Sequence, residues 1–224
     1  MAGLRERKKQ RTRDALVRAA NELFVSRGYE RTTVDDIAAV ADVSQRTFFR
    51  YFAGKEEAAF AIDVMIQERY VESLKARPPH ERPITALRNA VEDSWNSIGE
   101  AVARIVPLDL HMRMWHLIET TPALTAVQMR NAMDMEHRLA LIIAEREGLD
   151  VRADPRPQVL VASFSATMRT AMQSWGQGED LTVQGAREGA RGYLEALSPA
   201  LFDAWRPPAE ETPQPRQRCV RRWS

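Results

Sequence analysis

The sequence predicts an all-α protein with an N-terminal three-helix head containing a helix-turn-helix, a C-terminal helical bundle, and about nine helices in total. Three observations lead to this prediction. Apolar residues recur every three or four positions through most of the chain, which is the period of an amphipathic helix. Helix-capping residues such as Thr33, Ser44 and Thr182 stand directly before such stretches. Nearly all prolines lie between the candidate helices or near the C-terminus.

Composition narrows the class of protein. The chain has 224 residues, of which 44% are hydrophobic, and this is enough to bury a core in one large or two small domains. A single cysteine, Cys219, excludes an internal disulfide framework and is compatible with a reducing compartment. No apolar run approaches the roughly 18–20 residues that span a bilayer, and no apolar segment follows the charged N-terminus as in a signal peptide. We therefore expect a cytoplasmic protein without a membrane partner.

Positive charge is concentrated at the N-terminus. Residues 1–55 contain 12 Lys and Arg against 7 Asp and Glu, whereas the remainder contains 20 against 24. Six of the basic residues lie within positions 1–13, where we expect either a solvated end or an arm that follows phosphates. The first clearly amphipathic helix is expected over 15–27, and Gly28 is expected to end it. A polyanionic partner would meet this end of the chain.

The stretch 33–55 predicts two short helices joined by a tight turn. Thr33 with Asp36, and then Ser44, are the signals for the two helix starts. Phe48 and Phe52, four positions apart on the second helix, are expected to face inward. The side chains left outside belong to Gln45, Arg46, Thr47, Phe49 and Tyr51. This arrangement is typical of a helix-turn-helix that binds double-stranded DNA.

Each outer residue has an expected role in such a complex. The helix start at Thr33 offers free backbone N–H groups to a phosphate. Gln45, Arg46 and Thr47 can reach base edges in the major groove. Tyr51 and Lys55 are placed to contact the phosphate backbone. For Phe49 and Tyr51, a role as half-exposed core residues is the alternative.

These residues resemble the TetR family of one-component transcriptional regulators. The resemblance covers roughly residues 12–60 and is carried by Phe24, Gly28-Tyr29, Thr32-Thr33-Val34, Ile37-Ala38, Ala41, Val43-Ser44, Thr47-Phe48-Phe49, Tyr51-Phe52 and Lys55-Glu56. Asp42 stands where the family often has Gly, so the turn must hold Asp in a conformation that it tolerates better than most residues. The DNA contacts that the resemblance implies are Thr33, Val34, Ser44, Gln45, Arg46, Thr47, Phe49, Tyr51 and Lys55.

Further helices are expected over 55–75, 84–106, 108–119, 121–148, 154–175 and 182–197. We therefore divide the chain into a DNA-binding domain (1–55), a ligand-binding and dimerisation domain (56–206) and a tail (207–224). The tail is rich in Pro, Gln and Arg, cannot bury a core, and is expected to be disordered.

The last two helices are the expected homodimer contact, because two recognition helices are needed to read a palindromic operator. Small residues recur along the last helix, and the resemblance implies dimerisation through this pair. The expected contact residues are Phe164, Met168, Met172, Gly185, Gly189 and Gly192. Packing within one chain is the alternative.

Met and Trp are frequent in the middle of the chain. Residue by residue they fit a core better than a pocket, but the resemblance implies a cavity for a small-molecule effector of apolar or acyl type. The segment 115–175 is also similar to the C-terminal domain of an actinobacterial subgroup with acyl-CoA-responsive members. The candidate ligand-binding residues are Trp95, Met112, Trp115 and Met133.

Three functions fit the sequence: a ligand-responsive repressor, a DNA-binding protein without an effector, and a helical-bundle metalloenzyme. The last rests on His116-x-x-Glu119 and Asp134-x-x-His137, whose spacing places two ligands on one helix face. Further carboxylate partners for a two-metal site are not evident, and no nucleophile motif or phosphate loop occurs. We expect a repressor rather than an enzyme, with no cofactor and no metal.

Overall fold

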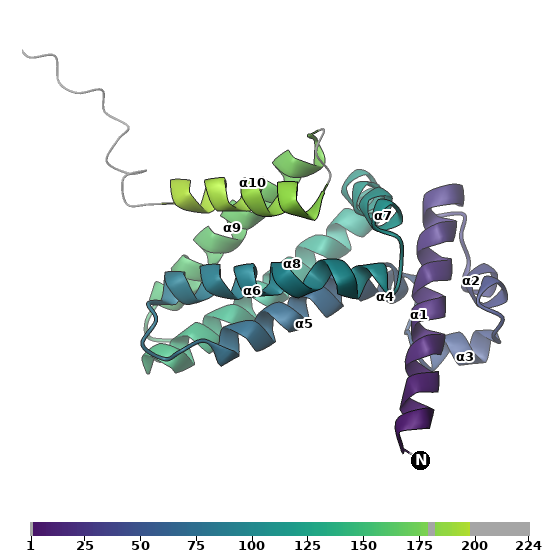
Figure 1. Ribbon diagram of the computed structural model, residues 1–224, viewed down its shortest axis with the longest axis horizontal. Helices are drawn as coiled ribbons and strands as arrows, with labels where there is room; N and C mark the ends of the chain where they lie inside the picture. Colours follow the sequence, from purple (N-terminus) through teal and green to yellow (C-terminus); the bar gives the residue numbers. More distant parts are fainter. Residues whose placement is uncertain (1, 179–181, 198–224) are drawn as a thin grey trace, which may run out of the picture.

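The fold is entirely helical over residues 2–178 and 182–197, the part of the chain that the computed structural model describes. The elements are α1 (Ala2–Arg27), α2 (Val34–Val40), α3 (Gln45–Phe49), α4 (Lys55–Ala59), α5 (Ala61–Ala76), α6 (Pro83–Ala103), α7 (Leu108–Thr120), α8 (Pro122–Glu147), α9 (Arg156–Gly176) and α10 (Val183–Ala196). The head, α1 to α3, lies at one end of an elongated molecule (Figure 1). The all-α prediction is confirmed.

The structure contains two helices, α4 and α5, where the sequence predicted one. The helix predicted over 55–75 is interrupted at Phe60, whose φ of −95° and ψ of 7° depart from helical values. Phe60 is buried together with Ala58 and Ala59 in the core of the head. The break between α4 and α5 therefore lies at the residue that packs into the core of the head.

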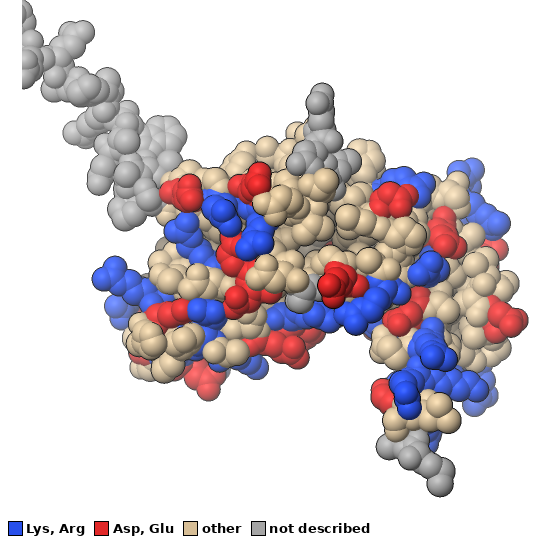
Figure 2. Space-filling model, in the orientation of Figure 1, with Lys and Arg blue, Asp and Glu red and all other residues tan. Residues whose placement is uncertain are grey.

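The first helix is longer than expected. It begins at Ala2 rather than near residue 15, so the arm expected over 1–13 is helical from its second residue onward. The segment is rich in Leu, Arg, Lys and Gln, which are good helix formers, and it contains no proline that would interrupt the helix. In Figure 1 the N-terminal turns of α1 extend past α3, and Figure 2 shows Lys and Arg gathered at this end. The basic segment is thus a helical projection of the head.

The core of the head contains the predicted inner residues. Leu16, Phe24, Ile37 and Phe48 are fully buried, and Phe52 is nearly so. The C-terminus of α1 is closed as expected. Gly28 has a φ of +87°, which glycine adopts without strain, and its N–H donates to the Phe24 carbonyl oxygen at 2.9 Å.

The bundle has its own core and also shares one with the head. Residues of α5, α6, α8, α9 and α10, such as Leu74, Leu87, Ile143 and Phe164, form the second core. The first core continues from the head into the end of α6, into α7 and to the start of α8. Because α7 packs against α1, a displacement of α7 can reach the head directly.

The tail prediction falls beyond the described residues, whereas the absence of a membrane span can be checked within them. The tail over 207–224, including Cys219, lies outside the described residues. Within the residues that are described, no helix is long and apolar enough to cross a membrane.

Candidate DNA-binding surface and ligand cavity

The start of α2 is held by a reciprocal pair of hydrogen bonds. The Asp36 backbone N–H donates to the Thr33 hydroxyl oxygen at 3.2 Å, and the Thr33 backbone N–H donates to the Asp36 carboxylate at 2.9 Å. The Thr33 hydroxyl also donates to the Asp36 carboxylate at 2.6 Å. This bond, the bond from the Thr33 N–H and a smaller contribution from Arg27 hold the pKa of Asp36 below its ordinary value. Asp36 is therefore a capping residue, and Val34, the first residue of α2, is held at the exposed helix start.

The turn between α2 and α3 is tight because one residue takes a left-handed conformation. Asp42 has a φ of +52°, as expected for a position where Gly is common. The Val43 N–H then donates to the Ala38 carbonyl oxygen at 3.0 Å. This bond brings the start of α3 back against α2.

The outward face of α3 carries polar and aromatic side chains. Ser44 caps the helix by accepting a hydrogen bond from the Thr47 N–H at 3.2 Å, and the two hydroxyl groups lie 3.0 Å apart. Gln45 and Arg46 in the first turn are exposed. In a helix of only five residues, this turn is the part that can enter a major groove.

Aromatic residues divide between core and surface at the end of α3. Phe49 is 51% exposed and packs edge-on against the buried Phe48 ring, with centroids 5.6 Å apart. Tyr51 is half-buried, and the Arg50 guanidinium lies 5.2 Å from its ring centroid. An exposed apolar ring beside polar groups suits contact with thymine methyl groups. The sequence reasoning missed Arg50, a cation on the same surface.

Lys55 points toward the head rather than away from it. Its ammonium group donates to the carbonyl oxygens of Tyr29 at 2.8 Å and Thr32 at 3.1 Å. It also lies 4.2 Å from the centroid of the Tyr29 ring. Two of its donor directions are therefore used inside the head, and its contact with a DNA phosphate stays a prediction.

A cavity of about 410 Å³ lies in the bundle, lined by residues of α5 to α10. Three of the four candidate ligand-binding residues, Trp95, Met112 and Trp115, line it. Met133 does not: it is 66% exposed on α8, while its neighbours Met129 and Met135 line the cavity. The prediction for Met133 is wrong because a long amphipathic helix carries methionines on both faces.

Two titratable residues of the cavity were missed by the sequence reasoning. Burial raises the pKa of Asp63, in the first turn of α5, to about 7. Burial lowers the pKa of His111, on α7, to about 4. Both shifts have the same cause, since a cavity with mostly apolar walls disfavours the charged form of either group.

The expected dimer residues of α9 point into the protein. Phe164 is only 2% exposed, and Phe164, Met168 and Met172 all line the cavity. Phe164 is therefore too buried to contact a second copy directly, and a dimer contact of the half-buried Met168 and Met172 stays a prediction. The outer face of α9 instead carries small or short side chains beside Val159, which is 62% exposed; they belong to Ala162, Ser163, Ala166 and Thr170.

The expected dimer residues of α10, which are glycines, differ from those of α9. A Cβ atom built on Gly189 or Gly192 would meet no atom within 4 Å, so packing within this chain does not require glycine there. Gly185 is half-buried. The opposite face of α10, with Ala186, Ala190 and Leu194, is buried.

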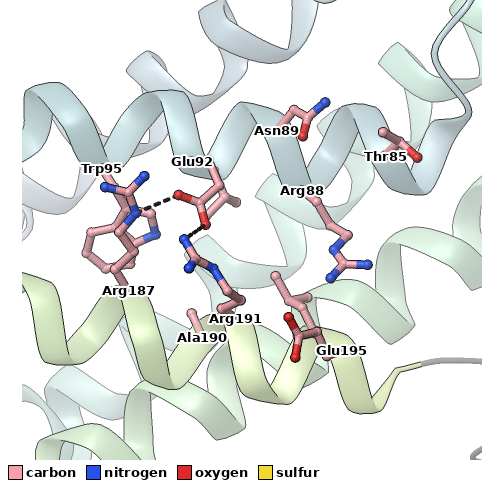
Figure 3. A pocket seen from close by; sticks show the side chains of 11 residues that line it. Thr85, Arg88, Asn89, Glu92, Trp95, Arg187, Ala190, Arg191 and Glu195 are labelled. Atoms are coloured by element: carbon pink, nitrogen blue, oxygen red, sulfur yellow. Dashed lines mark hydrogen bonds and ion pairs between the residues drawn. The ribbon is translucent and has the colours of Figure 1, made fainter.

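A surface groove separates α6 from α10 (Figure 3). Across it, the Glu92 carboxylate accepts hydrogen bonds from Arg187 at 2.6 Å and from Arg191 at 3.2 Å. Trp95 lines both this groove and the cavity. The Glu92 ion pairs therefore hold α10 against α6 beside one wall of the cavity.

The residues proposed for a metal site do not support one. Among the described residues, no three His, Cys, Asp or Glu side chains are grouped so that they could hold a metal ion. Of the two sequence pairs, Glu119 lines the cavity, and His116 and Asp134 are exposed.

Comparison with known proteins agrees with this geometry. The family model described as "Bacterial regulatory proteins, tetR family" matches residues 16–62, and that of the "MftR C-terminal domain" matches residues 81–190. The HTH-type transcriptional regulator TcmR of Streptomyces glaucescens is 42% identical over 206 residues, covering 92% of this chain and 91% of TcmR.

Solved structures share the fold. A complex of SmeT with triclosan aligns with a TM-score of 0.55 at 19% identity, covering 83% of this chain and 90% of SmeT. A transcriptional regulator from Aquifex aeolicus VF5 aligns with a TM-score of 0.53 at 15% identity, covering 84% and 99% of the two chains. These identities support the architecture alone, whereas the family models and TcmR match the sequence itself. The chain belongs to the TetR family of transcriptional regulators.

Proposed function

We propose that this protein represses transcription by binding a palindromic operator as a homodimer and leaves the operator when a small molecule occupies the bundle cavity. The observation that carries the DNA-binding part is the capped α3 helix, which presents Gln45, Arg46 and Phe49 outward from a rigid core. Thr33, Val34, Ser44, Thr47, Tyr51 and Lys55 complete the proposed contact set.

The proposed dimer contact uses the outer faces of α9 and α10. These helices pack against each other, so their free faces can form one surface. Gly189 and Gly192 would allow close approach of a second copy, which offsets the cost of about 1 kcal/mol for each glycine within a helix. The two copies of α3 would then meet successive major grooves about 34 Å apart.

The cavity adjoins a helix that contacts the head, which supports its proposed influence on that spacing. Trp115 and Met112 line it from α7, and α7 packs against α1 of the head. A ligand that fits one position of α7 better than another would favour a dimer with one particular distance between its heads. Its effect on DNA affinity cannot exceed its differential affinity for the two conformations.

The test compares binding of the full-length protein to its own upstream region and to random DNA, by fluorescence anisotropy over a range of salt concentrations. We expect Arg46→Ala to reduce the discrimination between the two duplexes by about 1–3 kcal/mol if Arg46 pairs with a guanine. Arg130→Ala removes an exposed arginine of α8 and is the matched control.

Two results would contradict the proposal. Equal losses on both duplexes for Arg46→Ala would make Arg46 a phosphate contact rather than a base contact. Absence of any preference of the unaltered protein for its own upstream region would refute operator binding there. The effect of a small molecule is measured separately, as dissociation of the protein from the fluorescently labelled duplex.

A further inference from the structure

We infer that the bundle cavity binds a largely aromatic molecule that donates hydrogen bonds and carries no negative charge. The inference rests on the proposed function of the cavity as the effector site and specifies the chemistry of its ligand. Three features of the described lining support it: aromatic walls, carboxyl groups without ion-pair partners, and the lack of an available cation.

The walls favour rings over flexible chains. Five aromatic residues line the cavity, namely Tyr70, Trp95, Trp115, Phe164 and Trp175. The rings of Trp115 and Trp175 lie 6.2 Å apart at 55°, and Gly176 leaves the space that the Trp115 ring occupies. Rings of this kind stack on aromatic ligands and also attract cations through their faces.

Negative charge in the lining is not balanced. The carboxyl groups of Asp63 and Glu119 form no ion pair among the described residues, whereas Glu136 accepts a hydrogen bond from Arg169 at 3.3 Å. Unpaired carboxyl groups in an apolar cavity need hydrogen-bond donors, and an occupant can supply them. An anionic occupant would instead add repulsion.

Among the described residues that line the cavity, no free positive charge is available for an anion. Arg169 is already paired with Glu136. Burial keeps the pKa of His111 near 4, so its imidazole is neutral at physiological pH, and burial also raises the pKa of the Tyr70 hydroxyl. Asp63, with a pKa of about 7, can donate or accept a proton near neutrality, and a cationic ligand would favour its carboxylate form.

The two unpaired carboxyl groups come from elements next to the head. Asp63 lies in the first turn of α5, three residues after Phe60, which is buried in the core of the head. Glu119 lies in the last turn of α7, the helix that packs against α1. A ligand that donates to both groups would therefore connect two of the elements through which the bundle meets the head.

The experiment uses four probes with one ring system: anthracene bearing a methylammonium, hydroxymethyl, methyl or carboxylate group at position 9. Binding to the full-length protein is measured by calorimetry and by quenching of tryptophan fluorescence. We expect the ammonium and hydroxymethyl probes to bind about 10-fold more tightly than the carboxylate and about 3- to 10-fold more tightly than the methyl probe. The two donor-bearing probes distinguish a cationic ligand from a neutral one.

Asp63→Asn tests the residue that carries the inference. We expect it to remove about 10-fold of the advantage of the ammonium over the methyl probe, because the amide keeps the shape but not the charge. Asp109→Asn changes a carboxylate whose side chain is 74% exposed on α7 and should leave the ratio unchanged. Glu119→Gln provides a second variant if Asp63→Asn does not fold.

The inference is overturned if the carboxylate probe or lauroyl-CoA binds as tightly as the donor-bearing probes. It is also overturned if no probe binds, or if the Asp63 and Glu119 variants both leave the ratio of affinities unchanged. Operator binding is measured on the same preparation. If the protein binds its operator but fails these tests, the proposed ligand class is refuted and the proposal of operator binding still stands.

Discussion

Replacement of Lys55 by methionine separates a structural role of this residue from a role in DNA binding. Its ammonium group donates to two carbonyl oxygens of the head and lies over the Tyr29 ring. Charge-assisted hydrogen bonds contribute about 1.5–3 kcal/mol each, and a cation–π contact adds about 0.5–2 kcal/mol. Because the side chain is half-buried and solvent offsets part of this sum, we expect Lys55→Met to lower the free energy of unfolding by about 2–4 kcal/mol.

The assay is urea unfolding followed by circular dichroism, combined with hydrogen exchange of the amides in α1 and α2. Exchange should accelerate around the loop that follows α1, between Tyr29 and Thr32, since Lys55 ties this loop to the start of α4. The control is Lys9→Met, because the side chain of Lys9 is 64% exposed and its 3.8 Å pair with Glu6 is weak. The control should change the free energy of unfolding by less than about 0.5 kcal/mol.

One result would refute this reasoning. If Lys55→Met leaves the unfolding free energy and the exchange rates unchanged but weakens binding to all DNA sequences and flattens the salt dependence, Lys55 acts only on phosphate. Loss of stability together with a proportional loss of DNA affinity would show that its contact with DNA is indirect.

Three further outcomes follow from other parts of the structure. Thr33→Val removes the hydroxyl acceptor for the Asp36 N–H and should lower the midpoint of thermal unfolding, at a cost of about 1 kcal/mol. Gly176→Ala adds a methyl group that would overlap the Trp115 ring, so we expect a loss of about 1–3 kcal/mol in urea unfolding together with a changed cavity. The folded-state pKa of Asp63 is about 7, above its ordinary 3.8, so the folded protein retains this proton more tightly than the unfolded chain does. The contribution of Asp63 to the free energy of unfolding therefore decreases as the pH rises from about 4 to about 7. The difference between unaltered protein and Asp63→Asn across this range should show that fall, and a flat difference would contradict the buried position.

The head could be predicted in detail because its signals are local. Thr33 and Ser44 cap helices through bonds to residues three positions away, and Asp42 takes its left-handed conformation within a single turn. The buried positions of Phe48 and Phe52 follow from their spacing of four on one helix face. All of these features depend on neighbours within a few residues.

Lys55 and Met133 show where local reasoning ends. The inward direction of Lys55 depends on carbonyl oxygens 23 and 26 residues away, which no local pattern contains. Met129, Met133 and Met135 are the same type of residue on one helix, α8. Met129 and Met135 lie on the side of α8 that lines the cavity, whereas Met133 lies on the exposed side. Periodicity identifies an apolar face without identifying its partner.

The sequence by itself therefore determined the all-α class, the helix-turn-helix and the polar surface of α3, because caps, turns and helical periods are encoded over short distances. Only the tertiary structure decided that Phe164, Met168 and Met172 line a cavity within the bundle. It also brought the carboxyl groups of Asp63 and Glu119 into the lining of one space. The physical reason is that burial and pKa depend on the helices packed around a residue, and those helices come from distant parts of the chain.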